Sequence, residues 1–223
     1  GSSTSVISGL NFSPDFVWGK SRNQTYDNEL VDIVRGGAKV LRSHTTGIES
    51  DYSSTPAVGS WNSDGITSST NFSMNYGSGN SSVAWLWDAG SANVTNDASS
   101  TGVGTIDSTY RANTTAGFSI VQYTGNGTSG ASFAHGLGAT PDFFIIKSTG
   151  YGYSWNTYHK SLGNTHLIRL DTNAAKVTES GAAWNDTSPT STVITLGNLG
   201  GTNQNTAEYI AYCWSEVEGY SKI

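Results

Sequence analysis

Short runs of apolar residues, each bounded by Gly, Asn, Ser or Asp, recur along the whole chain. Runs rich in β-branched and aromatic residues and closed by turn formers predict β-strands. The clearest are DFVWGKS, ELVDIVRG, AKVLRSH, SVAWLWDAG, GFSIVQYTG, DFFIIKS, THLIRLDT, STVITLGN and AEYIAYCW. Without long helices between these runs, the pattern predicts an all-β fold of the sandwich, jelly-roll or lectin-like kind.

One stretch, NELVDIVRGGAKVLR, is the only part of the chain with a helix-like pattern. Gly36 and Gly37 lie in its middle, and each Gly weakens a helix interior by roughly 1 kcal/mol. We therefore expect either two strands here, or one helical turn and a strand.

An eight-residue frame occurs twice, as GLNFSPDF from Gly9 and as GLGATPDF from Gly136. At the same spacing Lys20 matches Lys147 and Trp87 matches Trp214, although Trp61 needs a four-residue gap to match Trp184. Matches that resume at the same 127-residue spacing after a gap indicate two divergent copies of one unit. The sequence thus predicts two tandem β-sandwich units related by an internal repeat.

The two copies differ at their beginnings. GFSIVQYTG precedes the second frame as an opening strand, and nothing similar precedes the first frame. The last residues, GYSKI, resemble the start of that strand. An unpaired strand edge is a template for another chain. We therefore expect an open edge in the first unit, filled either by a neighbouring subunit's terminal strand or by the next unit of a longer tandem array.

The expected organisation has three parts. Residues 1–90 form the first unit, which lacks its opening strand, and residues 117–223 form the second unit with a terminal segment that pairs with a neighbour. Residues 91–116 are polar and rich in small side chains, and we expect them to be a connector. The candidate interface residues are Gly219, Tyr220 and Ile223.

Composition narrows the possible partners. The net charge of −6 disfavours nucleic acid, whose binders carry basic patches, and an anionic membrane surface. No apolar run reaches the length of a membrane span, so no membrane insertion is expected. Cys213 lies among apolar residues and is expected to be buried. Because it is the single cysteine of the sequence, an intrachain disulfide is excluded.

The motifs resemble a known family. ELVDIVRGGAKVLRSHTTGIES followed by SWNSDGIT, and later SWNTYHKSLGNT and YIAYCWSEVEGYSKI, are similar to tandem β domains of unknown function in virion and tail-fibre proteins of tailed phages, especially aquatic ones. The resemblance covers nearly the whole chain and implies β-sandwich structure and a virion or extracellular location. It transfers no catalytic residue, and Ile66 departs from the aromatic that usually follows the Asp-Gly pair.

Candidate chemistry is sparse. The four His residues have no metal-site spacing, and His135 and the repeated Asp15 and Asp142 are expected to stabilise turns. We expect no cofactor, no metal and no enzymatic activity. The aromatic stretch GYGYSWNTYHK could offer sugar-binding rings, although alternate members of a strand lie in the core. The candidate glycan contacts are Tyr151, Tyr158 and His159.

These observations favour a structural subunit of a phage tail fibre or an extracellular filament that assembles with copies of itself. The alternative is a module that binds host surface glycans at the tip of a fibre.

Overall fold

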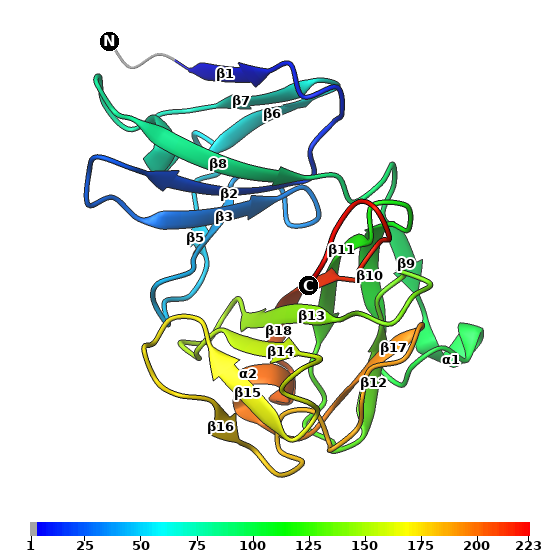
Figure 1. The fold of residues 1–223 in the computed structure, drawn as a ribbon. Coiled ribbons are helices and arrows are strands. Elements are labelled where there is room, and N and C mark those ends of the chain that lie inside the picture. Colours follow the sequence, from blue (N-terminus) through cyan, green and yellow to red (C-terminus); the bar gives the residue numbers. More distant parts are fainter. Residues whose placement is uncertain (1–3) are drawn as a thin grey trace. The chain divides into compact units, whose positions relative to one another are not determined.

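The computed structural model describes residues 4–223, which are folded almost entirely into antiparallel β-sheets (Figure 1). The chain divides into two compact units, with unit 1 ending at Asp88 and unit 2 beginning at Ala89. The expectation of a predominantly β fold is confirmed, and the helices found within residues 4–223 are single turns.

Unit 1 contains a five-stranded sheet in the order β5-β4-β3-β2-β8 and a three-stranded sheet in the order β1-β7-β6. Its elements are β1 (Ser5–Ser8), β2 (Phe16–Ser21), β3 (Asn28–Asp32), β4 (Lys39–Arg42), β5 (Ser50–Asp51), β6 (Val58–Asn62), β7 (Gly65–Ser68), the 3-10 turn η1 (Ser73–Asn75) and β8 (Ser82–Trp87).

The core of unit 1 takes side chains from both of its sheets. Val17, Val31 and Val40 contribute from the five-stranded sheet, and Val58 and Ile66 from the three-stranded sheet. All five are buried, because alternate residues of a strand point to the same face. The stretch with the helix-like pattern forms β3 and β4, joined by a turn that contains both glycines.

Unit 2 contains an eight-stranded sheet in the order β16-β15-β14-β13-β18-β11-β10-β9 and a two-stranded sheet of β12 and β17. Its elements are β9 (Val94–Asn96), α1 (Ala98–Thr101), β10 (Ser108–Asn113), β11 (Phe118–Thr124), β12 (Ala131–Ala134), β13 (Phe143–Ser148), β14 (Asn156–His159), β15 (His166–Arg169), β16 (Val177–Thr178), β17 (Val193–Leu196), α2 (Gly200–Asn203) and β18 (Glu208–Trp214).

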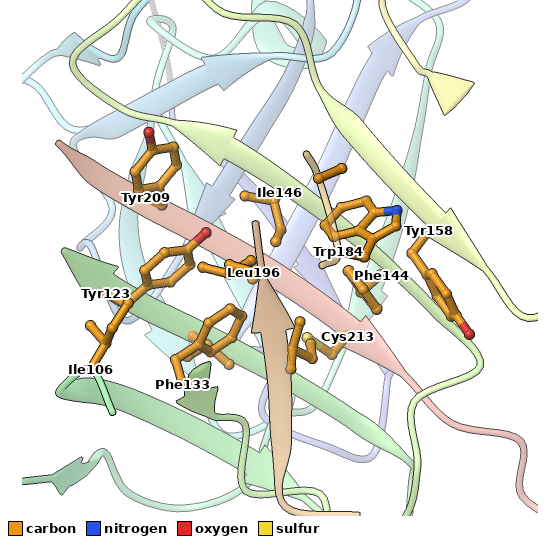
Figure 2. Packing of buried hydrophobic residues seen from close by; sticks show 14 of the residues in the cluster. Ile106, Tyr123, Phe133, Phe144, Ile146, Tyr158, Trp184, Leu196, Tyr209 and Cys213 are labelled. Atoms are coloured by element: carbon orange, nitrogen blue, oxygen red, sulfur yellow. The ribbon is translucent and has the colours of Figure 1, made fainter. Parts of the chain in front are cut away.

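Aromatic rings dominate the core of unit 2 (Figure 2). Tyr123 stacks on Phe133 with ring centroids 4.2 Å apart, and Phe144 stacks on Tyr158 at 4.6 Å. Trp184 meets the Phe144 ring edge to face and donates its indole N–H to the carbonyl of His166. Large rings bury much apolar area with few rotatable bonds, so they stabilise a core built from short strands.

The structure corrects the expected connector at residues 91–116. This range contains β9, α1 and β10, and both strands belong to the eight-stranded sheet of unit 2. Two of its apolar side chains, Ala98 and Ile106, are buried, whereas Val94 is 45% exposed. The polar composition of this range suggested a connector, but β9 is an edge strand, and half of the side chains of such a strand can face water.

Strand pairings in unit 2 occur at residue numbers 127 higher than pairings in unit 1. Phe16 lies opposite Trp87 and Phe143 lies opposite Trp214. Five ladders of unit 1 have such a counterpart: β2–β3 and β13–β14, β2–β8 and β13–β18, β3–β4 and β14–β15, β4–β5 and β15–β16, and β1–β7 and β12–β17. The spacing of the repeated sequence frame is thus also the spacing of these registers.

Candidate functional site

Strand β8 is the last strand of its sheet. It pairs with β2 along one edge, and no other strand of residues 4–223 pairs with its second edge. The strand at the matching position in unit 2, β18, lies between β13 and β11. The strand that matches β8 is therefore central in the sheet of unit 2, whereas β8 itself is an edge strand in unit 1.

Side-chain burial follows this difference. Tyr209, Ile210, Ala211, Tyr212 and Cys213 of β18 are all buried, whereas the side chains of β8 are half-buried or exposed. Trp85 is 48% exposed, and Tyr212 at the matching position is 0% exposed. In unit 2 the covering strand β11 places Ile120 opposite Tyr212 and Val121 opposite Ala211.

The open edge of β8 lacks the features that usually protect an edge strand. Its sequence, SVAWLW, has no Pro and no charged residue, and no bulge interrupts its pairing with β2. Natural edge strands are normally short, charged or bulged, because a long apolar edge pairs readily with another chain. In the two largest sheets the other end strands, β5, β16 and β9, have only two, two and three residues, whereas β8 has six.

The two faces of β8 are distinct. Ala84 and Leu86 point inward and pack against the core of unit 1. Trp85 points to the other face, where its ring meets Trp18 of β2 edge to face at 6.2 Å. A strand added beside β8 would extend both surfaces, because cross-strand neighbours share a face.

The candidate interface residues of the terminal segment lie in a turn. Gly219 has φ of +77°, and the backbone N–H groups of Tyr220 and Ser221 donate to the carbonyl of Val217 at 3.0 and 2.9 Å. Tyr220 is 72% exposed, and the N–H of Ile223 donates to Glu216 Oε1 at 2.8 Å. The segment is accessible, but it would have to open this turn to become a strand.

The candidate glycan contacts do not form one surface. Tyr151 is exposed, but Tyr158 is buried in the core between Phe144 and Trp184. His159 follows Tyr158 on β14 and therefore points to the opposite face, where it meets Phe143 edge to face. Tyr158 offers no ring face to a ligand in this structure.

Two of the residues expected to stabilise turns, His135 and Asp142, make such contacts. His135 is buried, its Nδ1 accepts the N–H of Leu137, and its Nε2 lies 3.1 Å from the carbonyl of Thr190. Burial lowers the pKa of His135 to about 4. Asp142 accepts the N–H of Glu216 at 2.7 Å and pairs with Lys160.

The single cysteine lies in an environment that does not favour reactivity. Cys213 is buried, and burial raises the pKa of its thiol to about 12, so the reactive thiolate is disfavoured. Within the described part of the chain, no group of three or more His, Cys, Asp or Glu side chains could hold a metal ion. Between residues 4 and 223 there is also no helix long and apolar enough to cross a membrane.

The sequence indicated an open edge in the first unit but did not identify the strand that carries it. The available signal was the uncharged run SVAWLW, whose matching run YIAYCW in unit 2 has a paired strand on each side. No curated protein and no solved structure matches the chain. The model of one family matches residues 1–223, and the chain belongs to that family, which is described as Domain of unknown function (DUF7483).

Proposed function

We propose that the chain is a structural subunit that assembles through the open edge of β8. The observation that carries this proposal is the contrast between β8 and β18: two strands with matching registers, one covered by β11 and one uncovered. Strand addition at such an edge gains affinity from main-chain hydrogen bonds and specificity from alternate side chains.

We infer that the two units are copies of one β-sandwich. If so, β8 should be paired on both edges, as β18 is. Five matched ladders and the twice-written frame support this inference. So do turn bonds outside the strands: the N–H of Asp15 donates to Trp87 and that of Asp142 donates to Trp214, each at 2.8 Å. If the two units share one strand order, a strand equivalent to β11 should pair with the free edge of β8.

The proposed counterpart is the segment Gly219–Ile223 of a neighbouring copy. Its sequence GYSKI matches the GFSIV of Gly117–Val121 in its Gly, its aromatic residue and its Ser. In the register of β11 on β18, Lys222 would lie opposite Trp85 and Ile223 opposite Ala84. Ile223 would then point toward the core of unit 1, where Ala84 packs, and Tyr220 would take the position of Phe118.

Such a contact joins two different surfaces, so it propagates from copy to copy unless its rotation closes a ring. The product is a filament or fibre. The resemblance to phage virion domains and the strand-built fold support a place in a tail fibre or an extracellular filament. The alternative is that the covering strand belongs to the next unit of a covalent array, which gives the same edge pairing within one longer chain.

Electron microscopy and light scattering of the purified chain test the proposal. We expect rods for the wild type and discrete particles after deletion of Gly219–Ile223. Trp85→Lys should also stop assembly, because it places a charge on the open edge. The matched control is Tyr151→Lys, a similarly exposed aromatic of unit 2.

Two outcomes would contradict the proposal in whole or in part. A wild-type chain that remains monomeric at high concentration overturns the proposal. Rods that persist after the deletion, with Trp85→Lys still blocking them, overturn the terminal segment as donor but retain the β8 edge.

A further inference from the structure

Unit 1 contains a cavity of about 300 Å³ where the beginning of β3 lies near the turn η1. The side chains that matter for the argument are Tyr26, Glu29, Arg42, Tyr52, Asn71 and Tyr76. We call this cavity the Glu29 pocket. It lies within unit 1 and uses no residue of the β8 edge.

Glu29 lies in the wall of the pocket as a buried carboxylate held between Ser73 and Arg42. The side chain is 2% exposed, and its Oε2 accepts the N–H of Ser73 at 2.7 Å. Its Oε1 forms an ion pair with Arg42 Nη2 at 3.7 Å, and the Ser73 side chain also hydrogen-bonds to the carboxylate. Each carboxylate oxygen has two acceptor positions, so Oε1 can also accept a hydrogen bond from a ligand in the pocket.

The strand register explains why Glu29 is there. It lies opposite Gly19 on β2 and opposite Arg42 on β4. A side chain at Gly19 would come within 2.8 Å of the Phe72 ring, so the Gly lets η1 and its flanks lie close to the sheet. The same approach brings Ser73 to Glu29.

Arg42 balances the acidic groups of the pocket. Its Nε donates to Asp27 at 2.5 Å, its Nη1 to Ser50 at 2.8 Å and its Nη2 to the Tyr52 hydroxyl at 2.9 Å. The guanidinium is thereby fixed in position beside Glu29. With one cation set between two carboxylates, the pocket does not require a strongly charged ligand.

Aromatic rings form the wall away from the sheet. Tyr26 and Tyr76 meet edge to face, with ring centroids 5.1 Å apart, and Tyr76 is 56% exposed. Asn80 holds the segment after η1 in place, because its amide donates to the carbonyls of Ser73 and Met74. The exposed ring is therefore presented from an ordered loop.

The matching place in unit 2 is filled. Asn156 replaces Glu29 and donates its amide to the carbonyls of Ser154 and Gly201. A side chain at Gly201 would come within 2.4 Å of that amide, so α2 packs directly against it. Tyr153, which replaces Tyr26, hydrogen-bonds to Gln204 of the segment after α2. At this position unit 1 combines a buried carboxylate, Glu29, with an exposed ring, Tyr76.

We propose that the Glu29 pocket binds a saccharide, with one pyranose ring placed on the Tyr76 face and a sugar hydroxyl donating to Glu29 Oε1. Sugars combine apolar C–H faces with many hydroxyls, and a site for them needs ring surfaces beside a few fixed polar groups. The pocket has both features, and its volume suits about one such ring. Asn71 at the rim adds amide groups for a second hydroxyl.

A small amine is the competing class, because a carboxylate beside aromatic rings also attracts cations. The fixed Arg42 guanidinium disfavours it, since a second cation would lie close to the first. The pocket shares no residue with β8, so saccharide binding does not depend on assembly through that strand.

Saturation-transfer NMR and a printed glycan array, applied to the full chain, test the pocket. The free probes are glucose, galactose, mannose and N-acetylglucosamine, with lysine methyl ester as the amine. We expect at least one pyranose to bind, and Tyr76→Ala to weaken it about tenfold or more, as expected for loss of a main contact. Glu29→Gln should also weaken it, because an amide cannot provide both acceptor positions.

Two measurements make the result decisive. Tyr151→Ala, which removes an exposed ring of unit 2, should leave binding unchanged, and circular dichroism should show that all variants keep their β signal. The proposal is overturned if no saccharide binds, or if Tyr76→Ala and Glu29→Gln bind as the wild type does. Binding of lysine methyl ester that depends on Glu29, without saccharide binding, overturns the ligand class.

Discussion

At the scale of single residues, His135 shows how burial turns a titratable group into a stability element. Its ring is buried, with the Nδ1 accepting from Leu137, so the neutral form carries its proton on Nε2 and donates it to Thr190. Protonation would place a second proton on Nδ1 and break the bond from Leu137. The pKa of about 4 expresses this preference for the neutral form.

Lowering the pH should therefore destabilise the protein through His135. The folded-state pKa lies below the unfolded value of 6.5, so its stabilisation is complete above pH 6.5 and is lost as the pH falls through about 4. The full loss is on the order of 3 kcal/mol. Urea unfolding at a series of pH values should show a shallower pH dependence for His135→Gln than for the wild type. Parallel curves for the two proteins would contradict this assignment.

At the scale of elements, the turn between β3 and β4 depends on a close backbone approach. A Cβ at Gly37 would lie 1.9 Å from the carbonyl oxygen of Val58, and the carbonyl of Gly37 accepts the N–H of Val58 at 3.0 Å. The turn therefore ties the two sheets of unit 1 together. A residue with any side chain would push them apart.

Gly37→Ala should thus destabilise unit 1 by roughly 1–3 kcal/mol, the usual cost of overpacking. The matched control is Gly150→Ala, because a Cβ at Gly150 meets no atom within 4 Å. Thermal or urea unfolding of both variants measures the difference. Equal stability of the two would mean that the sheets of unit 1 adjust without cost.

The elements were predicted from sequence where apolar residues alternate, and missed where they do not. β2, β8, β11, β13 and β18 all fall in runs identified as strands. β9 and β10 were missed because their side chains are mostly polar, and Val94 and Tyr110 alone do not make a pattern. Pairing with a neighbouring strand, which composition does not reveal, is what makes them strands.

The candidate sites also differ in how far the sequence alone could predict them. The open edge followed from comparing two stretches of one sequence, so a sequence argument could reach it. The Glu29 pocket could not be found in that way, because Tyr26, Glu29 and Tyr76 come together only through the fold. Tyr158 illustrates the converse: neighbours in sequence suggested a sugar-binding surface, and strand alternation placed its ring in the core.

At the scale of the whole molecule, the β8 edge is where one chain can recognise another. If β8 requires a strand of the β11 type, that strand need not be attached to a neighbouring copy. A synthetic peptide with the sequence of Gly117–Gly125, GFSIVQYTG, carries the complete version of the pattern that GYSKI only begins. It should occupy the edge in trans and end the growth of an assembly.

Adding this peptide to the wild-type chain should shorten rods or prevent them, and light scattering should fall as its concentration rises. A scrambled peptide of the same composition should have no effect, because register depends on the order of the apolar residues. Tyr fluorescence is unsuitable as a readout, but the exposed Trp85 should shift its Trp emission to shorter wavelength when a strand covers it. The Trp85→Phe variant identifies that signal, since it removes the indole and keeps a ring. A peptide that leaves both scattering and Trp emission unchanged would show that β8 does not accept a strand of this kind, and assembly would then need a different surface.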